Sequence, residues 1–326
     1  MRLMLAGGAG YIGSVLVPLL LEHGYEVDVH DLLWFGNHLP PEAKVFQRDL
    51  FSLKREDLEG YDQLIFLGGL SNDPMAEYSP ERNFIQNSAL PSYLAYTAKK
   101  AGVGRFIYAS SCSVYGYTVE KLYDEDSPVT CGYPYGISKL QGERGAFQLR
   151  DETFSVIALR QGTVSGWSPR MRFDLIVNTM YKAAVSEGTI TVNNPSIWRP
   201  ILDIRDAGMA FLRAVQANEG ISGVFNVADG NFTVGYVADL VKDEVEALTG
   251  RRVKLNILNK QDFRNYKVDC ARAGQVLGFV PRRGVADIVK SVHAHAGEYG
   301  DFSDPGYYNI EVFKRLAPPE SAAEAS

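Results

Sequence analysis

The sequence predicts an α/β fold with a doubly wound parallel sheet and a smaller C-terminal α/β domain. Short apolar runs alternate with helical patterns over the first 160 residues, and most runs are continuously apolar. Continuous apolar runs are typical of parallel strands buried on both faces, and strand–helix alternation is typical of a doubly wound sheet. The strands are expected at 2–6, 26–31, 44–49, 63–69, 105–111 and 154–160.

Helices are expected between these strands, at 11–23, 81–101 and 135–150. After residue 165 the pattern becomes less regular. We therefore expect a first domain at 1–165 and a second at 166–316, with some segments of the second returning to the first sheet. The small, polar and proline-containing tail at 317–326 is expected to be disordered.

Composition narrows the class of protein. The net charge of −6 disfavours non-specific binding to nucleic acid. Cys112, Cys131 and Cys270 show neither metal-ligand spacing nor a paired framework, so we expect free thiols in a reducing compartment and no metal. The longest apolar run, "VLVPLLL", is too short to span a membrane, and glycines interrupt the N-terminal apolar segment where a signal peptide needs its core. A cytoplasmic protein is expected.

Gly7, Gly10 and Gly13 form a GxxGxxG pattern between the first expected strand and helix. The first glycine permits a tight turn, the second lets backbone amides approach a pyrophosphate, and the third allows close packing of helix and strand. In this context the pattern predicts a dinucleotide site on a Rossmann-type sheet. The same site is expected to include loop residues and residues at the ends of the third and fourth strands: Tyr11, Ile12, Asp49, Leu50, Leu67 and Gly68.

Asp31 ends the second expected strand, where an acid can hydrogen-bond the ribose hydroxyls of the adenosine. Its carboxylate would repel a 2′-phosphate. The following loop, 32–43, contains no Arg or Lys to attract one. The sequence therefore favours NAD over NADP.

Tyr135 precedes Lys139 by four residues in "YPYGISK", so the two share one face of the expected helix. An ammonium beside a phenol favours the phenolate and is expected to lower the pKa of Tyr135 from its usual value of ~10. Such a tyrosine can exchange a proton with an alcohol or ketone while NAD exchanges the hydride. The neighbouring Tyr133 has isoleucine, not lysine, four residues on.

The glycine pattern, Asp31, "SSCSVYG" (110–116) and "YGISK" (135–139) together resemble the extended short-chain dehydrogenase/reductases. Within them the chain resembles the nucleotide-sugar epimerase/dehydratase branch, and "FNVADG" (225–230) and "ARAGQVLGFVP" (271–281) extend the resemblance into the C-terminal half. The resemblance implies that Asn87 contacts the cofactor and that Ser111 orients the reacting hydroxyl or carbonyl. It also implies a homodimer joined through the helices near 81–101 and 135–150, where Gly142 and Gly145 fit close packing.

The residues after Ser111 bear on the reaction. Dehydratases of this family carry an Asp–Glu pair there, whereas this chain has Cys112 and Ser113, which disfavours dehydration. Epimerisation through a transient keto intermediate, with C4 favoured, is the first hypothesis. A nucleotide-sugar dehydrogenase or 4-ketoreductase is the alternative, and a non-catalytic NAD sensor is a rival of another class. The NAD preference supports epimerisation, because that cycle regenerates its own cofactor.

Cys112 has two interpretations. Some relatives that epimerise keto-sugars beside the carbonyl use a cysteine in a similar context as acid or base. Cysteine is also a common small filler of buried sites, which is the interpretation we favour.

A nucleotide-diphosphate sugar needs cations for its diphosphate, and arginine binds such groups bidentately. By resemblance, Arg199 aligns with the arginine that contacts the diphosphate, and Arg264 is a second candidate. Further candidates for substrate contacts are Arg170 and Arg172, Thr163, which stands where relatives often have Asn, and Ser71, in the loop after the fourth strand.

Overall fold

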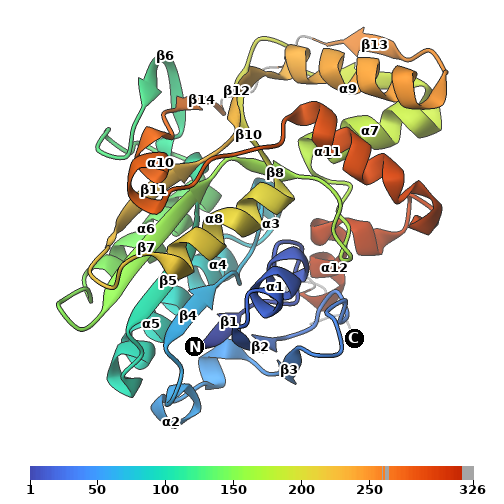
Figure 1. Cartoon of the computed structure of the whole chain (residues 1–326). Coiled ribbons are helices and arrows are strands. Elements are labelled where there is room, and N and C mark those ends of the chain that lie inside the picture. The colour runs from blue at the N-terminus through green and yellow to red at the C-terminus, as the bar shows by residue number, and fades with distance from the viewer. Residues whose placement is uncertain (259, 261–263, 318–326) are drawn as a thin grey trace, which may run out of the picture.

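The computed structural model describes residues 1–258, 260 and 264–317, with 117–120 described by their backbone only. A seven-stranded parallel sheet lies at its centre (Figure 1), in the order β11-β7-β5-β4-β1-β2-β3. The strands are β1 (Arg2–Ala6), β2 (Glu26–Asp31), β3 (Lys44–Gln47), β4 (Gln63–Phe66), β5 (Arg105–Ser111), β7 (Ser155–Gln161) and β11 (Gly223–Val227).

Helices cover both faces of this sheet, as the continuously apolar strands require. Leu3 and Leu5 of β1 pack in one core with α1 (Gly13–Glu22), α8 (Ile204–Gln216) and α10 (Ala271–Leu277). The alternate residues Met4 and Ala6 pack in a second core, where α2 (Arg55–Leu58), α5 (Leu90–Ala101) and α6 (Pro134–Phe147) lie. The doubly wound parallel sheet predicted from the sequence is therefore confirmed.

The helix expected at 81–101 is realised as α4 (Pro80–Phe84), a π-helical turn (Ile85–Ala89) and α5. Pro91 explains this irregularity, because proline has no N–H to donate to the carbonyl four residues earlier. That carbonyl belongs to Asn87, and it accepts a hydrogen bond from the Tyr108 hydroxyl instead (3.0 Å).

The two glycines of α6 serve packing within the chain. A Cβ on Gly142 would lie 2.3 Å from the carbonyl oxygen of Asn87, and one on Gly145 would lie 2.0 Å from the hydroxyl of Ser92. These glycines therefore let α6 pack closely on the π-helical turn and α5, and they carry no information about a second copy of the chain.

The C-terminal half forms a second core around helices and small sheets. The helices are α7 (Ile176–Glu187), α9 (Val234–Thr249) and α11 (Val285–Ala294). The small sheets are β8 (Thr163–Ser165) with β10 (Trp198–Asp203) and β12 (Gly230–Thr233), β9 (Thr189–Val192) with β13 (Lys254–Ile257), and β6 (Tyr117–Tyr123) with β14 (Asn265–Val268). Three elements of the C-terminal half return to the first sheet: β11 joins the seven-stranded sheet, and α8 and α10 pack on it. The domain boundary at residue 165 stays a prediction.

The last helix, α12 (Asn309–Leu316), packs against α3 (Asp73–Tyr78). Phe313 and Ala317 are buried there with Leu70 and Met75. Ala317, the first residue of the expected disordered tail, is thus part of the packed structure, and the rest of that tail lies outside the described residues. In the part of the chain that the structure describes, every helix is too short or too polar to cross a bilayer.

Candidate active site

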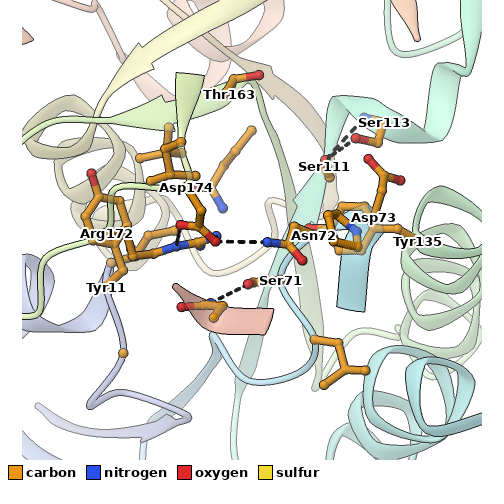
Figure 2. Close-up of a pocket in the computed structure, with 18 of the residues that line it drawn as sticks. Tyr11, Ser71, Asn72, Asp73, Ser111, Ser113, Tyr135, Thr163, Arg172 and Asp174 are labelled. Carbon is orange, nitrogen blue, oxygen red and sulfur yellow. Dashed lines mark hydrogen bonds and ion pairs between the residues drawn. The ribbon is translucent and has the colours of Figure 1, made fainter. Parts of the chain in front are cut away.

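A cleft of ≈ 700 Å³ opens where the parallel strands end at their carboxyl sides. Its walls come from the loops after β1, β2, β4 and β5, from the start of α6, and from the C-terminal half of the chain. Figure 2 shows side chains from both halves pointing into this space. Ligands of open α/β sheets bind at this edge, so the cleft is the candidate site.

The glycine loop after β1 has the geometry that its pattern predicts. Gly7 has a φ of +77°, and a Cβ there would lie 2.4 Å from the Cα of Gly68. A Cβ on Gly13 would lie 2.0 Å from the carbonyl oxygen of Gly8, so only glycine lets α1 begin so close to the turn. Gly10 lines the cleft and has no described atom within 3.7 Å of its would-be Cβ, the nearest being 3.8 Å away. The loop therefore leaves space for a diphosphate at the N-terminus of α1.

Asp31 lies at the end of β2 on the cleft wall. Its carboxylate accepts hydrogen bonds from the backbone N–H of Ala9 (2.9 Å) and of Leu33 (2.8 Å), which ties the first two loops together. Burial raises the pKa of Asp31, and these hydrogen bonds oppose the rise. Each carboxylate oxygen can accept a further bond, so the residue fits a ribose diol. Most of the other residues predicted for the cofactor site share the wall: Tyr11, Ile12, Asp49, Leu50, Leu67 and Gly68.

Asn87, predicted to contact the cofactor, lies behind the wall. Its side chain is fully buried, and its Nδ2 donates to the carbonyl oxygen of Leu70 (2.9 Å) and to Oδ1 of Asn83 (2.8 Å). The neighbouring Gln86 and Leu90 line the cleft instead. Asn87 itself therefore does not line the cleft, its Nδ2 supports the loop after β4, and its Oδ1 has no partner among the described residues. The predicted contact with the cofactor stays a prediction.

The three predicted catalytic residues meet on one wall. Ser111 ends β5, while Tyr135 and Lys139 come from the start of α6, which begins at Pro134, a residue suited to a first helical position. Lys139 Nζ donates to the carbonyl oxygen of Ala109 (3.0 Å) and lies 5.9 Å from the centre of the Tyr135 ring. Figure 2 shows Ser111 and Tyr135 close together on the side of the cleft opposite Tyr11.

The expected lowering of the Tyr135 pKa is not found. Burial raises the pKa of Tyr135, the charge of Asp73 raises it further, and Arg172 and a hydrogen bond with Ser111 lower it only in part. Burial also lowers the pKa of Lys139 to about 8. The prediction failed because the ammonium is directed at a backbone carbonyl rather than at the phenol. Tyr135 is therefore a neutral phenol in this structure.

Cys112 is excluded from the cleft. Its thiol is fully buried, donates to the carbonyl oxygen of Arg160 (3.0 Å) and packs with Val114 and Tyr115. Burial raises the pKa of the Cys112 thiol well above its usual value. This position disfavours the acid/base interpretation, because the sulfur faces β7 and not the cleft. The filler interpretation agrees with this position.

All four candidate arginines line the cleft, together with Ser71 and Thr163. Arg199 donates to the backbone carbonyl of Arg264, so these two lie together near β10 and β14. Arg264 also forms an ion pair with Asp73 (3.0 Å). The guanidinium of Arg172 binds both carboxylate oxygens of Asp174, at 2.8 and 2.9 Å.

Several cleft residues were missed by the sequence analysis. Figure 2 shows a network from Arg172 through Asp174 to Asn72, whose Nδ2 donates to Asp174 (3.1 Å). The spacing of Arg172 and Asp174 could have indicated this ion pair. Asn309, by contrast, donates to the Ser71 hydroxyl (2.6 Å) from a position 238 residues further along the chain, and no local pattern points to it.

Comparisons with known proteins agree with this geometry. The model of the NAD-dependent epimerase/dehydratase family matches residues 3–228. The chain is similar to the UDP-glucose 4-epimerase of Corynebacterium glutamicum, with 25% identity over 93% of this chain and 98% of the relative. The UDP-glucose 4-epimerase of Streptomyces lividans is also 25% identical, over 94% and 99%.

Solved structures give the same result. The structure of MoeE5 in complex with UDP-glucuronic acid and NAD matches with a TM-score of 0.79 and 26% identity, over 89% of this chain and 97% of that one. Because the family model covers more than half of the residues, the chain belongs to the NAD-dependent epimerase/dehydratase family and its cofactor is NAD.

Proposed function

We propose that the protein is an NAD-dependent epimerase of a nucleotide-diphosphate sugar, acting at C4 through a transient keto intermediate. The observation that carries this proposal is the gathering of Ser111, Tyr135 and Lys139 in the same cleft as the glycine loop and Asp31. The similarity over nearly the whole chain to UDP-glucose 4-epimerases supports it, as does the similarity to MoeE5, solved with UDP-glucose and NAD.

In the proposed mechanism, Tyr135 acts as a phenolate that accepts the proton of the C4 hydroxyl, and Ser111 Oγ holds the same oxygen by a hydrogen bond. This requires that the positive charge of bound NAD lower the Tyr135 pKa, which burial raises here, so that the phenolic proton is released to solvent on cofactor binding. NAD, which the glycine loop and Asp31 would hold, would supply the chemistry of hydride removal from C4 and of hydride return to the opposite face. Tyr135 then gives its proton back to the new alkoxide. Lys139 is fixed by the carbonyl of Ala109, which keeps a positive charge beside the cofactor site. Dehydration lacks its acid pair, since Cys112 is buried and Ser113 is a hydroxyl.

Arg199 and Arg264 would hold the diphosphate of the substrate, because they lie together on the cleft wall and arginine binds such groups bidentately. Arg172, Thr163 and Ser71 would make further contacts with the substrate. Both assignments are tested by the affinity of variants for a nucleotide sugar.

The test of the proposed function begins with the cofactor released from denatured, purified protein, identified by absorbance and mass. We expect retained NAD. A panel of nucleotide sugars is then scored by product analysis, and we expect a C4 epimer without net reduction of added NAD. Net reduction of free NAD would replace the proposal by a dehydrogenase, and a retained cofactor with no turnover on any sugar would favour a sensor.

Replacing Cys112 with alanine should leave turnover unchanged, because its thiol is hydrogen-bonded to the backbone of β7 and does not itself line the cleft. The same reasoning predicts that turnover in D₂O places no deuterium on carbons beside the keto position. Both are measured by NMR of the product. Loss of activity in the variant together with deuterium at such a carbon would restore the thiol as an acid or base.

We infer that the enzyme is a homodimer of the cytoplasm that serves carbohydrate biosynthesis. Large apolar side chains are exposed along α4, the π-helical turn, α5 and α6: Phe84, Ile85, Tyr96 and Ile137. An exposed apolar patch of this kind is typical of an interface. Light scattering on the purified protein gives the oligomeric state directly.

A further inference from the structure

We propose that Arg170 binds the diphosphate of NAD, and that Asn309 of the C-terminal helix holds it in place. This inference rests on membership of the NAD-dependent family and not on which sugar reacts. It separates Arg170 from the arginines that would serve the substrate.

The position of Arg170 is defined by three loops. Its guanidinium carbon lies 3.8 Å from the ring centre of Phe35, which follows β2, and it interacts electrostatically with Tyr11, which follows β1. Through Asn309 it is connected to Ser71, which follows β4. Because β1 lies between β2 and β4 in the sheet, a side chain bounded by all three loops lies over the glycine loop.

The charge of Arg170 lacks a matching anion. The side chain is 97% buried, with 3% exposed, yet within the described ranges it forms no ion pair and its Nε has no hydrogen-bond partner. Arg172 differs, since it is held by both oxygens of Asp174. Burial lowers the pKa of Arg170 to about 9, and the charge of Arg172 contributes, while Asp174 opposes the change. A buried cation is costly unless it is paired, so the site favours an anionic ligand.

The diphosphate of a dinucleotide is an anion that would pair with the positive charge of Arg170. Its oxygens would lie at the N-terminus of α1, where Tyr11 and Ile12 line the cleft, and a guanidinium above them would complete the site. The substrate diphosphate is assigned its own pair of arginines, Arg199 and Arg264, which lie together, with Arg264 also paired to Asp73. Figure 2 shows Tyr11 on the opposite side of the cleft from Ser111 and Tyr135, which separates the diphosphate end from the reacting end.

Asn309 is the residue that positions Arg170. Its Oδ1 accepts from Nη2 of Arg170 (2.5 Å), and its Nδ2 donates to the hydroxyl of Ser71 (2.6 Å). The amide is held from both sides, so its Oδ1 restrains Nη2 of the guanidinium, while Nε is buried without a partner among the described residues. The first residue of α12 thus joins the cofactor site to the C-terminal end of the fold.

The test measures binding by calorimetry on the full-length protein after its NAD has been removed. Arg170→Gln should raise the Kd for NAD and for ADP-ribose by about 10- to 100-fold, because both ligands carry the diphosphate. Its Kd for adenosine, which has no phosphate, should not change. Arg170→Lys, which keeps the positive charge, should lose less affinity for these two ligands than Arg170→Gln. Arg213→Gln is the matched control, since Arg213 is exposed on α8 and does not line the cleft.

The remaining outcomes decide against the proposal. A loss of affinity for UDP-glucose in the NAD-loaded variant, with NAD and ADP-ribose unaffected, would assign Arg170 to the substrate. An equal loss for adenosine would show a general disturbance of the cleft. Should Arg170→Gln fail to fold, Asn309→Ala provides the second variant. It should weaken the binding of NAD and of ADP-ribose but not the binding of adenosine. Unchanged binding of all three ligands would overturn the positioning role of Asn309.

Discussion

Tyr135→Phe is expected to lower kcat by about 10²- to 10⁴-fold, the range typical of a lost general acid or base. The Tyr135 phenol lines the cleft and is hydrogen-bonded to Ser111, and phenylalanine keeps the ring but cannot exchange a proton. The amount of NAD that copurifies should not fall, because the glycine loop and Asp31 are untouched. Product formation from the active nucleotide sugar, followed by NMR, gives the rate.

Tyr133→Phe is the matched control for this variant. Tyr133 precedes α6 by one residue but does not line the cleft, so its turnover should equal that of the wild type. A Tyr135→Phe enzyme that keeps a rate within tenfold of the wild type would mean that another group moves the proton, and the proposed mechanism would fall.

Glu143→Ala is expected to lower the free energy of unfolding by about 3–5 kcal/mol, which is typical when one partner of a buried ion pair is removed. Glu143 and Arg160 are both almost fully buried, and their closest oxygen and nitrogen are 2.5 Å apart. Burial lowers the pKa of Arg160, but the hydrogen bonds and the charge of Glu143 outweigh burial and raise the Arg160 pKa above its usual range. Without the carboxylate, a guanidinium stays buried and unpaired. Denaturant unfolding of the NAD-free protein measures the loss.

A pair at the surface provides the control. Arg55 and Glu59 form an ion pair of the i,i+4 type with both side chains more than half exposed. Glu59→Ala should therefore cost no more than about 0.5 kcal/mol. Combining Glu143→Leu with Arg160→Met should cost less than Glu143→Ala, since no uncompensated charge remains. A loss of under about 1 kcal/mol in Glu143→Ala would show that water or neighbouring groups replace the carboxylate.

Much of the fold and the cofactor end of the cleft could be predicted from the sequence because the signals there are local. Strand β1, the glycine loop and the start of α1 are consecutive, and the contacts that require Gly7 and Gly13 are made within a few residues or with the adjacent strand end. Asp31 closes β2 at the same edge of the sheet. Tyr135 and Lys139 are one helical turn apart, and so both reach the same wall.

The remainder depends on contacts between distant segments. Sequence spacing places Lys139 beside Tyr135 but cannot show that the carbonyl of Ala109 captures the ammonium. Asn87 lies behind the cleft wall, because the Nδ2 of its carboxamide holds the loop after β4. Asn309 reaches the cleft only because α12 folds back onto α3, which no local pattern reveals.

The apolar contacts of α12 have a kinetic consequence. Asn309 and Ile310 form part of the cleft wall, while Phe313 and Ala317, at the other end of the same short helix, are buried against the loop after β4 and α3. Detaching the helix would expose the Phe313 ring, at a cost of about 1.5–3 kcal/mol. The detached form would then amount to roughly one molecule in 10 to one in 150. The residence time of the cofactor would lengthen by a similar factor wherever its exit requires this detachment.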